Sequence, residues 1–146
     1  MPRARRNDDR GQGATLRRRI GETAHGFIPD PSVATYEIFK PALLAVVEAW
    51  DPVCAMSYPD ALFKLVPGGT YFHESWIQYL CPSLATLVTP PSAPVIVERL
   101  ANGGLLMSAT RQTFDVENPA HMAAARDMAA SIAPLNALPW EDRARA

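Results

Sequence analysis

Fourteen prolines interrupt this 146-residue chain, and their positions limit the length of every helix and strand it can form. Proline lacks a backbone N–H and clashes with the preceding turn of a helix, so it is rare inside helices and central strands. Many of them mark the ends of apolar stretches: Pro41, Pro52, Pro82, Pro90, Pro91, Pro94, Pro119 and Pro134. We therefore expect short elements with sharp ends, rather than a bundle of long helices.

Charge divides the chain into a basic start and an acidic body. Residues 1–26 carry seven arginines against three carboxylates, a net charge of +4. Residues 27–139 carry five cations against ten carboxylates, a net charge of −5. Because residues 1–26 also lack apolar periodicity, we expect a disordered basic tail there. Residues 27–140 are expected to form a single α+β domain, and residues 141–146 a second short tail.

The acidic body limits the partners that this protein can bind. A surface of net negative charge repels nucleic acid and attracts proteins whose own sites are basic. No stretch is long and apolar enough for a membrane span or a secretory signal. We expect a cytoplasmic protein with a protein partner, without direct nucleic-acid or membrane contact.

Two segments show the apolar spacing of amphipathic helices. In the first, about 35–50, the apolar positions recur at helical intervals, and Pro41 is expected to interrupt the helix or to delay its start. In the second, about 119–133, Asn118 is a favoured N-cap and Pro119 is favoured at the first helical position. Pro134 is expected to end that helix.

The remaining apolar runs are rich in strand-forming residues. A β-hairpin is predicted over about 94–110, because Ala101-Asn102-Gly103-Gly104 can supply the positive φ angles of a tight reversal. Val53–Tyr58 and Trp76–Leu80 are predicted as further strands. The predicted fold is thus α+β, a small and mainly antiparallel sheet packed by the two helices.

Candidate chemical groups are few. His73-Glu74-Ser75 contains a base, an acid and a hydroxyl, but adjacent side chains point in different directions and rarely form a catalytic relay. The histidines and cysteines have no metal-ligand spacing, so we expect no metal, no cofactor and no catalytic residue. The alternative is a small hydrolase or transferase that uses His73 or His121 with a nearby carboxylate, and it would show a deep pocket.

Several short runs resemble the immunity protein 52 family over roughly Tyr36 to Pro139. They are Trp50-Asp51-Pro52, Trp76-Ile77-Gln78-Tyr79-Leu80, Asn102-Gly103-Gly104-Leu105-Leu106, Thr113-Phe114-Asp115 and Asn118-Pro119-Ala120-His121. The resemblance implies a cytoplasmic antitoxin that binds a cognate bacterial polymorphic toxin, typically a nuclease of restriction-endonuclease-like type. Family members are longer at the N-terminus, so this chain is expected to be a short member.

A protein inhibitor can block a nuclease by presenting carboxylates to the basic surface that holds its substrate. From loop position and charge we predict partner contacts by five acidic residues with two aromatic anchors: Asp51, Asp60, Glu74, Asp115 and Glu117, with Trp76 and Tyr79. A structural module of a secretion or phage-derived system is a third hypothesis, and a large apolar patch would favour it.

Overall fold

A computed structural model describes residues 34–66 and 71–139. The predicted tails, residues 1–26 and 141–146, lie outside this range. In chain order the elements are α1 (Tyr36–Trp50), β1 (Cys54–Ser57), α2 (Asp60–Phe63), β2 (Ile77–Leu80), α3 (Pro82–Ala85), β3 (Ile96–Arg99), β4 (Leu105–Ser108), α4 (Pro119–Ile132) and the 3-10 helix η2 (Ala133–Ala137). The predicted α+β class is confirmed.

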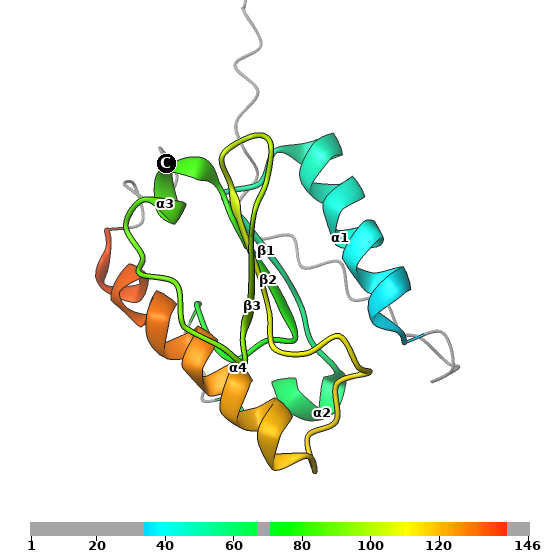
Figure 1. Cartoon of the computed structure of the whole chain (residues 1–146). Helices are drawn as coiled ribbons and strands as arrows, with labels where there is room; N and C mark the ends of the chain where they lie inside the picture. The colour runs from blue at the N-terminus through cyan, green and yellow to red at the C-terminus, as the bar shows by residue number, and fades with distance from the viewer. Residues whose placement is uncertain (1–33, 67–70, 140–146) are drawn as a thin grey trace, which may run out of the picture.

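The four strands form one antiparallel sheet in the order β1-β2-β4-β3. At one end of the sheet a register row joins four residues, Ser57, Ile77, Ser108 and Ile96, and we call it the Ser57 end. The turn between β3 and β4 lies at the opposite end, which we call the hairpin end (Figure 1). Every connection therefore leaves the sheet at one of these two ends.

Helices cover both faces of the sheet. Neighbouring residues of a strand point to opposite faces, and the two neighbours Met107 and Ser108 contact different helices. Ser108 Oγ hydrogen-bonds to Tyr36 of α1, and Met107 Sδ lies 3.9 Å from Ser131 Oγ of α4. Figure 1 shows α1 and α4 on either side of the strands. Consequently all eight residues of β2 and β4 are buried.

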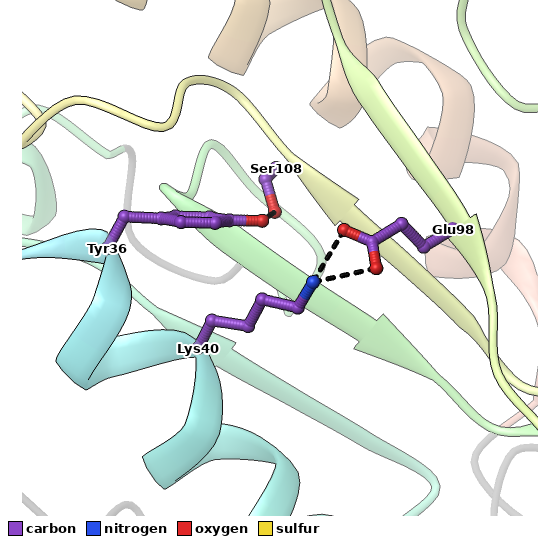
Figure 2. Close-up of polar contacts among 4 residues, drawn as sticks. All are labelled: Tyr36, Lys40, Glu98 and Ser108. Atoms are coloured by element: carbon purple, nitrogen blue, oxygen red, sulfur yellow. Dashed lines mark hydrogen bonds and ion pairs between the residues drawn. The ribbon is translucent and has the colours of Figure 1, made fainter.

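Polar contacts fix the first half of α1 to the sheet (Figure 2). The Tyr36 hydroxyl lies 3.2 Å from Ser108 Oγ, and the Lys40 ammonium donates to both carboxylate oxygens of Glu98 on β3 at 2.7 Å. Phe39 packs against Trp76 with ring centroids 5.3 Å apart. These contacts hold the first turn in place.

The prediction that Pro41 interrupts this helix or delays its start is wrong. α1 begins at Tyr36 and continues through Pro41 to Trp50. The proline lies on the exposed side of the helix. Tertiary packing of the first turn thus outweighs the local cost of proline.

The predicted hairpin is confirmed as β3 and β4, and its turn closes on the neighbouring strand. Gly103 adopts φ +86°, a conformation that favours glycine. Gly104 needs the absence of a side chain for a different reason. A Cβ at this position would lie 2.6 Å from Cε2 of Tyr79 and 3.0 Å from the carbonyl oxygen of Leu80.

We predict that Gly104→Ala destabilises the fold by about 1–3 kcal/mol, because the added methyl group must displace the buried Tyr79 ring or the β2 backbone. Urea unfolding followed by circular dichroism measures the loss. Ala101→Ser, an exposed change in the same turn, is the control and should stay within about 0.5 kcal/mol. Equal stability of the two variants would contradict the close approach of Gly104 to β2.

A second prediction concerns the Lys40–Glu98 ion pair, whose side chains are partly shielded from solvent. A double-mutant cycle of Lys40→Met and Glu98→Gln should give a coupling free energy on the order of 1 kcal/mol that decreases as salt rises. The exposed pair Asp60–Lys64 is the comparison, and its coupling should be smaller because both side chains are well solvated. A negligible Lys40–Glu98 coupling would show that α1 is held without this ion pair, by its apolar contacts and the Tyr36–Ser108 hydrogen bond.

Cys54 and Cys81 are free thiols, half-buried and buried respectively. Burial raises the pKa of the Cys54 thiol, and the nearby Cys81 raises it further, whereas the Tyr71 hydroxyl partly opposes the shift. Since the thiolate is the reactive form, Cys54 should react with iodoacetamide more slowly at pH 8 in the folded protein than in guanidinium chloride. Peptide mass spectrometry of the alkylated chain tests this, and equal rates would contradict it.

Candidate partner-binding surface

Two connections meet at the Ser57 end of the sheet. The first runs from β1 to β2 and contains α2, and the second runs from β4 to α4. Figure 1 shows α2 and the segment before α4 at the same end of the molecule, opposite the hairpin turn. Because all strand pairs are antiparallel, the end of β1, the start of β2 and the end of β4 must lie together there.

Four of the predicted carboxylates lie in these two connections. We call this set the acidic surface: Asp60, Glu74, Asp115 and Glu117. In the described part of the same connections the cations are Lys64 and Arg111. Lys64 Nζ lies 2.6 Å from Oδ2 of Asp60, but both side chains are highly exposed, so this pair contributes little and opens readily. The surface therefore carries excess negative charge.

Three rings lie together in the first connection, which also carries Asp60 and Glu74, and we call them the aromatic cluster: Tyr58, Phe63 and His73. The rings of Tyr58 and Phe63 are stacked, with centroids 5.3 Å apart and an interplanar angle of 13°. His73 meets Tyr58 edge-on at 5.4 Å. Phe63 is 45% exposed, and burial raises the pKa of the half-buried Tyr58 hydroxyl. The Phe63 ring is thus held in place by its neighbours and is still accessible from solvent.

His73 is 8% exposed and uses one ring nitrogen for the local backbone. Its Nδ1 lies 2.7 Å from the Glu74 carbonyl oxygen. A carbonyl oxygen can only accept, so Nδ1 carries the proton. In the neutral ring Nε2 is then an acceptor, and within residues 34–66 and 71–139 it has no hydrogen-bond partner.

Hydrogen bonds to the main chain hold the connection between β4 and α4. The Asp115 N–H donates to His121 Nδ1 at 3.1 Å, so Nε2 of that ring carries the proton and contacts Gln112 Oε1. The Asp115 carboxylate accepts the Glu117 N–H at 2.9 Å. The Asn118 side chain caps α4 by accepting the Ala120 N–H. These bonds fix the backbone that presents Asp115 and Glu117.

The other predicted contacts lie elsewhere. Asp51 is exposed at the hairpin end, where it ends α1 with φ 43°. Trp76 and Tyr79 are 3% and 0% exposed. Trp76 Nε1 donates to the Thr110 carbonyl, and the Tyr79 hydroxyl accepts from Asn102. In this structure neither aromatic side chain can reach a partner, because both belong to the core.

The aromatic residue that the sequence reasoning missed is Phe63. It follows Leu62 in a one-turn helix, where neighbouring side chains project about 100° apart, so one can face the core while the next faces solvent. Leu62 is buried and Phe63 is exposed. No local pattern in the sequence decides which of these two side chains faces solvent.

The contacts of the two histidines bear on the enzymatic alternative. In the described ranges neither His73 nor His121 is hydrogen-bonded to a carboxylate, and both nitrogens of His121 hold the loop. Among those residues no group of three histidine, cysteine, aspartate or glutamate side chains could hold a metal ion. None of the described helices has the length and apolar character needed to cross a membrane.

Comparisons with known proteins bear on the identity of the chain. The family model described as immunity protein 52 matches residues 21–136. The match includes residues 21–26, which belong to the predicted tail. Searches of curated proteins and of solved structures found no match. Since the family model spans most of the chain, this protein belongs to the immunity protein 52 family.

Proposed function

We propose that this protein is an antitoxin that binds and neutralises a cognate bacterial polymorphic toxin, and that the toxin is a nuclease. The observation that carries the proposal is the acidic surface at the Ser57 end of the sheet. A nuclease binds polyanionic substrate with lysine and arginine, so its substrate-binding surface is complementary to exposed carboxylates. The complex would form in the cytoplasm, where the toxin would otherwise reach nucleic acid.

The acidic surface suits this role in its rigidity as well as its charge. The backbone around Asp115 and Glu117 is held by His121 and Asn118. A surface that is already ordered loses less conformational entropy on binding. Complementary charge also accelerates association, which favours an inhibitor that must act before its toxin reaches substrate.

A role in binding explains the polar groups of this site better than catalysis does. The carboxylates lie on the surface, and His121 of α4 is used in holding the loop before that helix. The family assignment supports the same conclusion, because immunity proteins act by binding. We therefore propose that the protein inhibits its toxin stoichiometrically, without turnover.

The first test is co-expression in a bacterium of this chain with the toxin encoded beside its gene. Rescue of growth together with a stoichiometric complex in gel filtration is the expected result. Absence of both rescue and complex would reject the antitoxin function. Rescue without a complex would instead favour an enzymatic role for His73 or His121.

Neutralising the acidic surface should weaken the complex. We predict that the quadruple variant Asp60→Asn, Glu74→Gln, Asp115→Asn and Glu117→Gln slows association with the toxin by about tenfold at low salt and flattens its salt dependence. The amide at position 115 can still accept the N–H of residue 117, so the loop should keep its shape. Stopped-flow mixing over a range of salt concentrations measures both effects.

The control for this variant removes exposed carboxylates from the other end of the molecule. Glu48→Gln with Asp51→Asn alters the end of α1. This pair should change the association rate by less than threefold. If the control variant loses as much as the quadruple variant, the toxin docks at the hairpin end and the acidic surface is not its site.

A further inference from the structure

We propose that the aromatic cluster is the centre of the toxin interface and that it receives an arginine side chain of the toxin. This inference rests on the proposed function and adds the chemistry of the contact. The guanidinium would stack on the Phe63 ring, and its N–H groups would donate to acceptors beside that ring. Arginine is the basic residue that combines planar stacking with several directed donors.

The ring offers an anchor that is both accessible and fixed. Phe63 is nearly half exposed, and its stacking on Tyr58 at 5.3 Å restricts its motion. His73 in turn supports Tyr58 through an edge-on contact. Interface hot spots are commonly aromatic or arginine side chains that lose little freedom on binding.

The acceptors around the ring match a cation in particular. Nε2 of His73 is an acceptor on a side chain that is more than nine-tenths buried, and it has no partner in the described part of the chain. Among the described residues the buried side-chain atom without a partner is Ser57 Oγ, so this nitrogen still reaches solvent. A donor from a partner would replace water at this acceptor. Lys64 occupies only Oδ2 of Asp60, which leaves the other oxygen to accept. Glu74 adds a second carboxylate one residue from His73.

A rival anchor is Trp50, which is 60% exposed at the end of α1. No ring of the described residues packs against it, so binding would have to immobilise its side chain at an entropic cost. Its neighbour Asp51 and nearby Glu48 lie at the hairpin end, away from the acidic surface. The aromatic cluster is the better candidate because its ring is already packed and adjoins a partnerless acceptor.

The test uses the full chain and the purified toxin domain encoded beside its gene, with affinity measured by isothermal titration calorimetry. Phe63→Leu removes the ring face and should weaken binding at least tenfold, whereas Phe63→Tyr keeps the face and should stay within threefold. His73→Phe keeps a ring but removes the acceptor, and should also weaken binding at least tenfold. Leu65→Ala and Leu87→Ala, two exposed apolar controls, should change affinity less than twofold.

One variant should bind the toxin more tightly than the wild-type chain does. Lys64→Gln removes a cation that would repel the arginine and occupy Asp60, so binding should tighten about two- to fivefold. A gain of affinity cannot result from misfolding, which separates this outcome from damage to α2. Thermal melting of each variant identifies those that lose affinity because they unfold.

The outcomes separate the two proposals. If the wild-type chain binds the toxin but Phe63→Leu, His73→Phe and Lys64→Gln all stay within twofold, the arginine contact is rejected while the antitoxin function stands. If Trp50→Ala loses tenfold and Phe63→Leu does not, the centre lies on α1 and the inference is overturned. If the wild-type chain does not bind the toxin at all, both proposals fall.

Discussion

Burial of the two central strands on both faces is the constraint on which the rest of this structure depends. β2 and β4 contribute four consecutive buried positions each, and four-residue strands cannot form a stable layer without cover. α1 and α4 supply that cover. The polar side chains within the layer must then find internal partners, as Ser108 does with Tyr36 and Ser75 does with Gln78. Within the described ranges Ser57 Oγ is the buried side-chain atom that has none.

That arrangement decides where a partner can bind. With both faces of the central strands covered, the exposed polar groups lie on the outer sides of the helices and at the ends and edges of the sheet. The antiparallel order then brings the two long connections to the same end, although Glu74 and Asp115 are distant in sequence (Figure 1). A binding surface can therefore be assembled from segments whose relative position depends on the sheet alone.

The sequence predicts the elements of this fold well where a local signal coincides with tertiary packing. Asn118-Pro119 defines the start of α4, and the asparagine caps it as expected. Gly103-Gly104 identifies the hairpin, although only the structure shows that Gly104 is required by the Tyr79 ring. Pro41 misleads because contacts made far away in sequence, by Tyr36 and Lys40, stabilise the turn that precedes it.

The candidate site is less accessible to sequence reasoning. Asp60, Glu74, Asp115 and Glu117 follow from charge and loop position, but their gathering at one end depends on strand order, which no local pattern encodes. Trp76 and Tyr79 were chosen as anchors for their residue type, and burial depends on packing instead. Phe63 escaped notice because packing, which no local pattern encodes, decides that Leu62 faces the core and Phe63 faces solvent.

The hydrogen bonds of the connection before α4 affect how easily such a protein could evolve to bind a different toxin. The loop is shaped by main-chain N–H groups together with His121 and Asn118. Among the described residues the Glu117 side chain makes no hydrogen bond or ion pair, and the Asp60 side chain makes only an exposed ion pair. Substitution at these positions would alter what the surface recognises while the scaffold stays intact, so a new toxin could be matched by few mutations at little cost in stability.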